Sequence, residues 1–243
     1  MPERFSLKSY PNAETAQTYA AREISAILQK YSEAKTPVLF LVSGGSALKL
    51  IDAIDSNAFN PNLTIGVLDE RFSADPAVNN FSQLSQTSFY AKAKAAGCTF
   101  VDTRVQNNET IESLTWRFTQ ALKDWKENHH RGGIIITQGI GSDGHTAGIL
   151  PFPEDEPGFE KLFNQPDVWV VHYDAAGKNP YPWRVTTTLS FLRLVDHAIV
   201  FICGQDKQVA LLKTVAETGS LAQTPARIIR EMNDVAIYTD IQI

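Results

Sequence analysis

Runs of consecutive apolar residues constrain the fold of this sequence more than any other feature. Residues 38–42 read VLFLV, and residues 134–136 are three isoleucines in a row. A strand that is apolar on both faces is buried on both faces, which is typical of a parallel sheet covered by helices on either side. Similar runs at 65–68 and 198–203 repeat this pattern. The sequence therefore predicts an α/β fold built on a buried, mostly parallel sheet.

Amphipathic helices are predicted between these strands. Apolar residues recur at three- and four-residue spacing over 13–31 and over 109–125, so each segment presents one apolar face. Shorter helices and further strands complete the pattern: helices at 47–54 and 206–217, strands at 168–172 and 235–238. Alternation of this kind favours a three-layer α/β sandwich with a mostly parallel, Rossmann-like sheet. Since no repeat or linker-like segment divides the sequence, we expect a single domain over residues 1–243.

The composition narrows the class of protein. Among 243 residues, 43% are hydrophobic and 20% are charged, which is ordinary for a globular domain. The net charge of -5 argues against a general nucleic-acid binder, because such a protein needs clustered positive charge to neutralise phosphates. Cys98 and Cys203 lie far apart, without the spacing of a zinc site or a disulfide framework. We expect neither a bound metal nor a nucleic-acid partner.

The sequence carries no signal for secretion or membrane insertion. The N-terminal residues MPER are not followed by the apolar run of a signal peptide. The longest apolar runs have about five to seven residues, whereas a membrane-spanning helix needs about 20. A cytoplasmic protein with no membrane partner is expected.

Polar side chains gather where three of the predicted strands end. The clusters are Ser43–Ser46, Asp69–Arg71 and Gly139–His145. In open α/β sheets, ligands bind at the carboxyl ends of the strands, near the point where the strand order reverses. Because all three clusters fall at strand ends, we expect them to converge on one site.

The cluster Ser43-Gly44-Gly45-Ser46 lies between a strand and a predicted helix. Glycines let the backbone approach a ligand closely, and a helix N-terminus offers N–H groups to an anion. One interpretation is a phosphate cradle. The alternative is an ordinary strand-to-helix turn in which Ser46 is the N-cap. The spacing of a Walker loop is absent.

The cluster Asp69-Glu70-Arg71 also has two interpretations. Arg71 is suited to grip a phosphate with two parallel N–H groups, with Asp69 or Glu70 orienting it. The alternative is a solvated charge cluster that ends a strand.

The segment Gly139–His145 formally matches GxGxxG, but it lies past the middle of the chain rather than in the first strand–helix unit, which disfavours a nicotinamide cofactor. Asp143 and His145 instead suggest catalysis. A histidine titrates near pH 7 and can act as a general base, and a neighbouring carboxylate can orient it. The alternative is a histidine that caps a helix. His172 and His197, which flank predicted strands, are interpreted as structural.

Taken together, these blocks resemble the 6-phosphogluconolactonase family, within a fold group that includes glucosamine-6-phosphate deaminases. The resemblance rests on ordered blocks that span nearly the whole chain: LVSGGS (41–46), LDERF (68–72) with Asp75-Pro76 and Asn79-Asn80, GIGSDGHTAGILPF (139–152), the weaker WRVTTTL (183–189), and Gly204-Gln205-Asp206-Lys207.

The resemblance implies hydrolysis of 6-phosphogluconolactone to 6-phosphogluconate, a step of the oxidative pentose phosphate pathway, without metal or organic cofactor. His145 would deprotonate the attacking water and Asp143 would orient His145. The substrate-binding residues would be Ser43, Gly44, Gly45, Ser46, Asp69, Arg71, Arg184 and Lys207. The expected partner is a small sugar phosphate, and the expected state is a monomer or a small homo-oligomer.

Two alternatives stay open. A deaminase or aldose–ketose isomerase of the same fold group would carry a glutamate where this chain has Leu150, and tends to have an aromatic residue where Arg71 stands. This sequence also departs from the pattern of the 6-phosphogluconolactonase family at two places. The Thr-Pro that commonly follows SGGS in the family is Ala47-Leu48 here, and the loop after Arg71 lacks a His-Pro pair. A non-catalytic sugar-phosphate sensor is the second alternative, although no basic helix-turn-helix precedes Ala13.

Overall fold

The computed structural model describes residues 5–175, 177 and 181–242. Seven strands form one sheet in the order β1-β10-β9-β6-β2-β3-β5, and every neighbouring pair is parallel. Their bounds are β1 (Phe5–Ser9), β2 (Val38–Val42), β3 (Leu63–Val67), β5 (Thr99–Phe100), β6 (Gly133–Gly139), β9 (His197–Ile202) and β10 (Asp234–Thr239). The prediction of a buried parallel sheet is confirmed.

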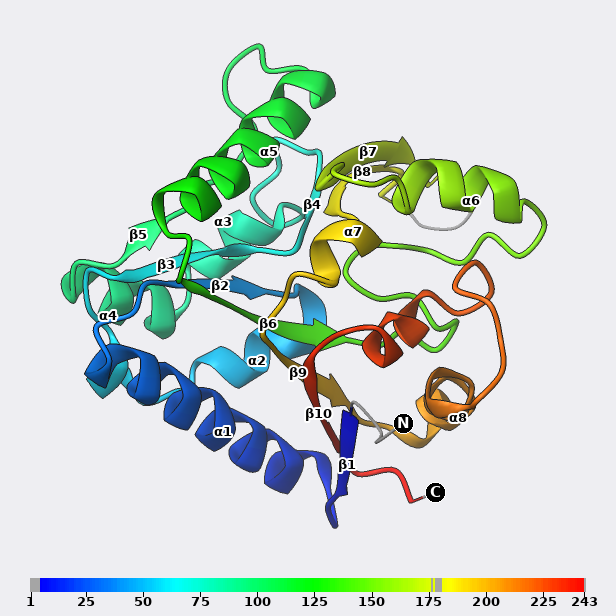
Figure 1. Cartoon of the computed structure of the whole chain (residues 1–243), viewed down its shortest axis with the longest axis horizontal. Coiled ribbons are helices and arrows are strands. Elements are labelled where there is room, and N and C mark those ends of the chain that lie inside the picture. Colours follow the sequence, from blue (N-terminus) through cyan, green and yellow to red (C-terminus); the bar gives the residue numbers. More distant parts are fainter. Residues whose placement is uncertain (1–4, 176, 178–180, 243) are drawn as a thin grey trace.

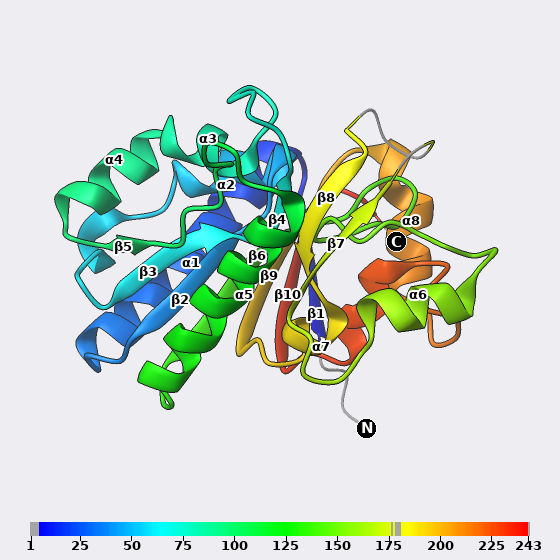
Figure 2. The same ribbon diagram turned by 90° about the horizontal axis from the view of Figure 1, so that it is seen from above.

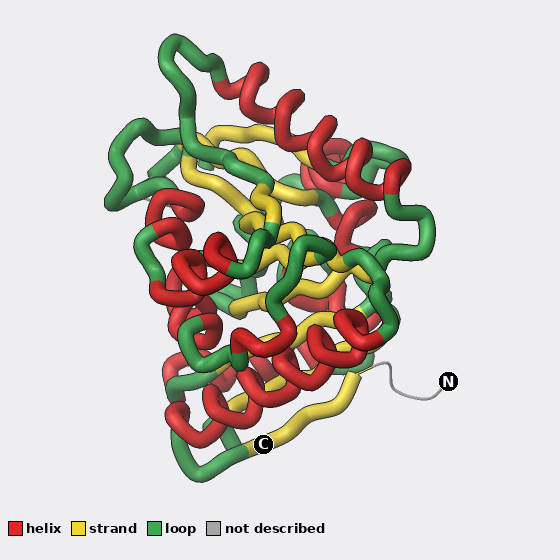
Figure 3. Tube along the Cα trace, turned by 90° about the vertical axis from the view of Figure 1, so that its left-hand side faces the viewer, coloured by secondary structure: helices red, strands yellow, loops and turns green. Residues whose placement is uncertain are grey.

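The apolar strands bury both of their faces because alternate side chains enter two different cores. In β2, Leu39 and Leu41 belong to one core, while Phe40 and Val42 belong to the other. The second core is covered by α1 (Ala13–Glu33), α2 (Leu48–Ile51), α3 (Asn80–Ser85) and α4 (Ser88–Ala95). The first is covered by α5 (Ile111–Asn128), α7 (Leu189–Leu192) and α8 (Gln208–Val215). Helices therefore lie on both sides of the sheet, which confirms the three-layer sandwich (Figures 1 and 3).

The two long helices form where the apolar periodicity predicts them. α1 begins after Asn12, whose side chain accepts a hydrogen bond from the backbone N–H of Thr15 at 2.9 Å. α5 begins after Thr110, which caps the N–H of Ser113 in the same way. Such caps satisfy N–H groups that have no partner within the helix.

A second, antiparallel sheet was not anticipated from the sequence. It has the order β4-β8-β7, with β4 (Asp69–Arg71), β8 (Trp183–Thr187) and β7 (Val170–Asp174), and it packs beside α6 (Glu156–Phe163) (Figure 2). Leu68 joins the two sheets: its N–H donates to Val42 at 3.0 Å, and its carbonyl accepts from Thr187 at 3.1 Å. The chain thus leaves the parallel sheet at Leu68 and enters the antiparallel one directly.

Several predicted boundaries were wrong. The expected helix at 47–54 is a 3₁₀ turn (Gly45–Ala47) followed by the single turn of α2. Asp52 is the C-cap of α2, and its carboxylate accepts a hydrogen bond from the N–H of Phe89 in α4 at 3.0 Å. β7 starts two residues later than predicted, because Val168 lies in a turn in which its N–H reaches the carbonyl of Gln165. The helix expected at 206–217 is α8 preceded by a 3₁₀ turn.

The strand order reverses between β2 and β6. From β2 the chain continues to β3 on one side, and after β5 it returns to the other side of β2 as β6. Ligand sites of parallel α/β sheets lie at such a reversal, outside the carboxyl ends of the two strands. Among the described residues, no helix combines the length and the apolar composition that crossing a bilayer requires.

Candidate active site

A cleft of about 380 Å³ opens at the reversal point, over the carboxyl ends of β2 and β6. Eight of the ten residues expected from the sequence line it: Ser43, Gly44, Gly45, Asp69, Arg71, His145, Arg184 and Lys207. Asp143 does not line the cleft, but it is hydrogen-bonded to His145, which does. Ser46 lies in the 3₁₀ turn beside it, and its side chain is outside the described part of the chain. The expected convergence of the three polar clusters is therefore found.

His145 and Asp143 form a hydrogen-bonded pair at the mouth of the cleft. His145 Nδ1 and Asp143 Oδ1 are 2.5 Å apart, and the same oxygen accepts the backbone N–H of His145 at 3.1 Å. With Asp143 as the acceptor, Nδ1 carries the proton and Nε2 keeps its lone pair. Burial raises the pKa of Asp143, but the hydrogen bonds and charge of His145 outweigh burial and leave it below its usual value. Asp143 therefore stays ionised and fixes the ring.

The loop that carries this pair is a closed turn rather than a helix start. The N–H of Gly141 donates to the carbonyl of His145 at 2.9 Å, and Gly144 adopts a φ of +87° that favours glycine. The next helix, α6, begins only at Glu156. The interpretation of His145 as a helix cap is therefore wrong.

The second sheet holds this loop from behind. The hydroxyl of Tyr173 in β7 donates to the carbonyl of Gly148 at 2.6 Å, and the hydroxyl of Thr186 in β8 donates to the carbonyl of Ala147. Since both side chains are buried, the loop is fixed by rigid strands, which is what a catalytic group needs.

The glycine-rich turn after β2 is held by its neighbours rather than by a long helix. The N–H of Ser43 donates to Thr137 Oγ1 in β6 at 3.1 Å. A Cβ on Gly44 would lie 2.6 Å from Asn80 Oδ1, so only glycine fits there. The N-cap of α2 is Ala47, not Ser46, so the N-cap interpretation is not supported. Because α2 has a single turn, its dipole contributes little to binding an anion. The cradle would bind an anion through the backbone of the loop and through Ser43.

The charged triplet Asp69–Arg71 is not a solvated cluster, since Asp69 is 6% exposed and Glu70 is fully buried. Its pairing with β8 sets Arg71 directly opposite Arg184. Like charges in such a cross-strand position repel one another. Asp69 Oδ2 lies 3.5 Å from Arg184 Nη1 and balances one of the two charges. Among the described residues, no carboxylate pairs with Arg71, so its charge is available to an anion in the cleft.

The two guanidiniums also retain hydrogen-bonding capacity. Within the described chain, Nε of Arg71 and Nε of Arg184 are both buried and without a partner. Arg71 Nη1 reaches the carbonyl of Val78 only at 3.4 Å, and its guanidinium lies 5.3 Å from the ring centre of Tyr181. Buried donors of this kind are normally paired, so they indicate a ligand with several acceptor oxygens.

One residue of the site region, Asn80, was missed from the sequence, and a second, Glu70, was expected only as one of two carboxylates that could orient Arg71. Asn80, noted only as part of a motif, lines the cleft and donates from Nδ2 to the carbonyl of Asp69 at 2.8 Å. Glu70 lies behind the cleft with no exposed surface. No periodicity marks either residue, because each acts through contacts between distant segments. The interpretation of His172 and His197 as structural fits their partners, Thr115 and Asp234, and neither lines the cleft.

Burial raises the pKa of Glu70 to about 7, even though the N–H groups of Phe81, Asn80 and Arg71 and the Thr103 hydroxyl lower it. In the unfolded chain this carboxyl titrates near 4.5. From about pH 4.5 to 7 the unfolded state loses its proton first, so stability falls as pH rises. Relative to Glu70→Gln, which cannot titrate, the unfolding free energy of the wild type should drop by about 3 kcal/mol between pH 4 and pH 8. Urea titrations of both proteins at several pH values test this, and a constant difference would show an ordinary pKa.

The comparisons with known proteins agree with this geometry. The sequence model of the family described as glucosamine-6-phosphate isomerases/6-phosphogluconolactonase matches residues 11–238. A 6-phosphogluconolactonase of Neisseria meningitidis serogroup A is 26% identical over 207 residues, which cover 84% of this chain and 85% of that protein. One from Xylella fastidiosa (strain 9a5c) is 23% identical over 210 residues, or 86% and 84% of the two chains.

Solved structures show the same fold. The 6-phosphogluconolactonase of Trypanosoma brucei superposes with a TM-score of 0.75 at 20% identity, covering 98% of this chain and 96% of that one. The enzyme of that name from Thermotoga maritima gives 0.74 at 20% identity, with 97% and 98% covered. The match of the family's sequence model over nearly the whole chain, with its motif residues gathered in one cleft, shows that this chain belongs to the glucosamine-6-phosphate isomerase/6-phosphogluconolactonase family.

Proposed function

We propose that this protein is a 6-phosphogluconolactonase, which hydrolyses 6-phospho-D-glucono-1,5-lactone to 6-phospho-D-gluconate in the oxidative pentose phosphate pathway. One observation carries the proposal: the cleft combines a histidine held by a carboxylate with two opposed arginines, and among the described residues only one of these arginines has a carboxylate partner. The first arrangement suits activation of water, and the second suits a phosphate. The curated relatives named above bear the same name.

In the proposed mechanism, Nε2 of His145 takes a proton from water as the water oxygen attacks the lactone carbonyl carbon. The carbonyl becomes a tetrahedral oxyanion, which Lys207 would stabilise; Lys207 lines the cleft from the turn after β9. When the oxyanion collapses, the bond to the ring oxygen breaks. Nε2 of His145 returns its proton to that oxygen, which becomes the 5-hydroxyl of the product. Asp143 stabilises the imidazolium between the two transfers.

The substrate would lie with its phosphate toward Arg71 and the Ser43–Gly45 turn. Arg71 offers donors in the fork geometry that matches phosphate oxygens. Arg184 is 5% exposed and already shares Asp69, so its main role would be to shape that end of the cleft. The hydroxyl of Ser43, which is buried and unpaired within the described chain, would face the same end.

The deaminase alternative lacks a group that it needs. Leu150, at the position where deaminases of this fold group carry a glutamate, is 2% exposed and packs in the apolar core. An apolar side chain cannot transfer the proton for which that carboxylate is used.

The proposal is tested with fresh 6-phospho-δ-lactone in a pH-stat, with and without a metal chelator. The protein should accelerate hydrolysis well above the spontaneous rate, and the chelator should have no effect. Hydrolysis no faster than the spontaneous rate, together with ammonia release from glucosamine 6-phosphate, would show a deaminase instead. Tight binding of 6-phosphogluconate without turnover would show a sensor.

The proposal includes a single domain that works in the cytoplasm as a monomer or a small homo-oligomer, without nucleic-acid partners. Size-exclusion chromatography with light scattering measures the oligomeric state. Retention on a DNA column at physiological salt would contradict the proposed absence of nucleic-acid partners.

Gly141→Ala should impair catalysis by displacing His145. A Cβ at this position would lie 2.2 Å from both Cε1 and Nδ1 of the imidazole, so the ring has to move. Misplacing a catalytic group by about 1 Å costs roughly 100-fold in rate. The control is Gly139→Ala at the end of β6, just before the loop, whose added Cβ would meet no atom within 4 Å. Equal rates for the two variants in the pH-stat would contradict the role given to His145.

A further inference from the structure

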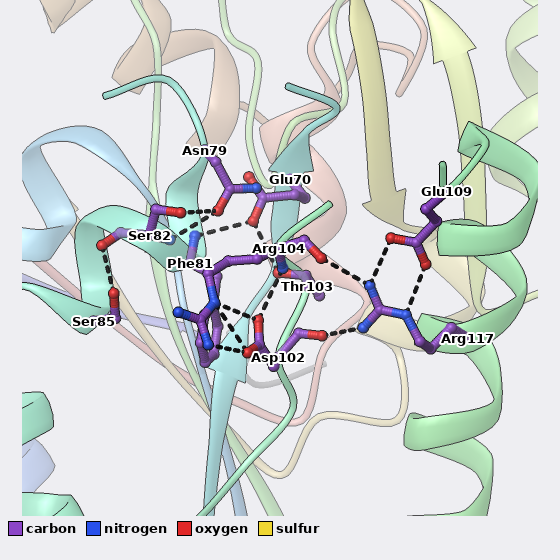
Figure 4. Close-up of polar contacts among 10 residues, drawn as sticks. All are labelled: Glu70, Asn79, Phe81, Ser82, Ser85, Asp102, Thr103, Arg104, Glu109 and Arg117. Carbon is purple, nitrogen blue, oxygen red and sulfur yellow. Dashed lines mark hydrogen bonds and ion pairs between the residues drawn. The ribbon is translucent and has the colours of Figure 1, made fainter. Parts of the chain in front are cut away.

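Glu70 is a fully buried carboxylate that no cation among the described residues pairs with. It accepts four hydrogen bonds instead. Oε1 accepts the N–H of Asn80 at 2.5 Å and of Arg71 at 2.8 Å. Oε2 accepts the N–H of Phe81 at 3.0 Å and the hydroxyl of Thr103 at 2.8 Å, and these two contacts are drawn in Figure 4. These four donors stabilise the ionised carboxylate and partly offset the burial that raises its pKa. This buried carboxylate of Glu70 lies directly behind the cleft.

The four donors come from three separate segments of the chain. Arg71 belongs to β4, Asn80 and Phe81 form the first turn of α3, and Thr103 lies in the loop that follows β5. No backbone ladder joins β4 to α3, and the intervening residues have no regular structure except turns. Glu70 is therefore the main polar link between these segments.

The link ends on residues of the cleft. In β4, Asp69 and Arg71 line the cleft while Glu70 between them points away, as alternation along a strand requires. Asn80 lines the cleft from α3 and donates to Asp69. One carboxylate thus fixes the backbone of both Arg71 and Asn80.

The loop that bears Thr103 is itself anchored. Arg117 of α5 donates to the carbonyls of Asp102 and Arg104 on either side of Thr103, and it pairs through two bonds with Glu109 (Figure 4). Thr103 is fully buried between these contacts. Its hydroxyl is therefore held at a defined place against Glu70.

We propose that Glu70 is a positioning residue that sets the phosphate-binding arm of the cleft, by holding β4 and the start of α3 so that Arg71 and Asn80 face the substrate. This inference rests on the proposed lactonase function. Glu70 itself touches neither the substrate nor the Asp143–His145 pair, which lies in the separate loop after β6. Its loss should therefore weaken phosphate recognition and leave the chemical step largely intact.

The test is Glu70→Gln, assayed on 6-phosphogluconolactone and on unphosphorylated gluconolactone. Glutamine replaces one of the two carboxylate oxygens by an NH₂ group, which donates hydrogen bonds and cannot accept them. Two of the four hydrogen bonds to Glu70 would therefore be lost. We expect KM for the phosphorylated lactone to rise about tenfold, the effect of weakening one charge-assisted contact. We expect kcat within about threefold of wild type, and KM for the unphosphorylated lactone nearly unchanged. Glu127→Gln, an exposed change of the same kind on α5, is the matched control.

A parallel fall of kcat on both substrates without a KM difference would show a purely structural role and overturn the proposal, as would wild-type kinetics. If Glu70→Gln does not fold, the variants Thr103→Val and Thr103→Ser test the proposal instead. Valine removes the hydroxyl and should raise KM for the phosphorylated lactone severalfold, whereas serine should restore it. Equal KM values for the two would overturn the proposal. A wild type without lactonase activity would instead refute the proposed function, and calorimetric binding of 6-phosphogluconate would then give the same comparison without turnover.

Discussion

Replacing His145 with alanine should reduce lactone hydrolysis to the spontaneous rate. The side chain is the one imidazole that lines the cleft within the described chain, and the hydrogen bond to Asp143 leaves Nε2 free of that partner, so that in the proposed mechanism Nε2 accepts the proton from water. General acid–base catalysis of this kind contributes about 10²- to 10⁴-fold. Because the lactone also opens without enzyme, the rate has to be measured on fresh substrate against a protein-free blank.

His130→Ala provides the control for this experiment, since His130 is exposed in the turn after α5. That variant should keep wild-type turnover. Asp143→Asn should fall between the two, because the ring remains but its tautomer and charge are no longer supported. Turnover by His145→Ala at the wild-type level would refute the general-base assignment and, with it, the mechanism.

Replacing Arg71 with alanine should separate phosphorylated from unphosphorylated substrates. The loss of one charge-assisted contact costs about 1.5–3 kcal/mol, which corresponds to a rise in KM of roughly ten- to a hundredfold for the phosphorylated lactone. Turnover of unphosphorylated gluconolactone should change little. Arg71→Lys should recover only part of the loss, since an ammonium lacks the two parallel donors.

Arg71 gives a cleaner test than Arg184. Removing Arg184 would leave Asp69, which is 6% exposed, as a buried carboxylate without its cation. Breaking such a pair destabilises a fold by several kcal/mol, so the effect on binding would be obscured. If Arg71→Ala affects both substrates equally, the phosphate lies elsewhere in the cleft. Phosphate density away from Ser43–Gly45 in a crystal with 6-phosphogluconate would independently refute the cradle.

The parts of the fold that follow from local pattern were predictable. β2 and β6 are apolar on both faces, and such runs have few alternatives to a buried parallel strand. Because the carboxyl ends of parallel strands lie at the same edge of a sheet, the sequence alone indicated that the loops with Ser43 and His145 lie close together. The hydrogen-bonded pair of Asp143 and His145 was predictable for a simpler reason, since the two residues are two positions apart in one loop.

The second sheet depends on long-range pairing and gives no such pattern. β4 consists of three charged residues, which have low strand propensity, and it is a strand only because it pairs with β8 more than a hundred residues later. The burial of Glu70 follows from that pairing and from the donors of α3. The contact between Asp52 at the end of α2 and the start of α4 likewise joins distant segments, and the local pattern does not show it.

The pairing of β1 with β10 has a consequence for the synthesis of this protein. In the described sheet, β1 lies at the edge with β10 as its neighbour, and more than 200 residues separate the two strands. At roughly 5–20 residues per second, β1 leaves the ribosome about 10 to 45 s before its partner does. Until then its backbone N–H and carbonyl groups have no native ladder, and the growing sheet ends at β9. The strand made first is thus ordered last, and it is the segment most open to wrong pairing or to capture by a chaperone while the chain grows.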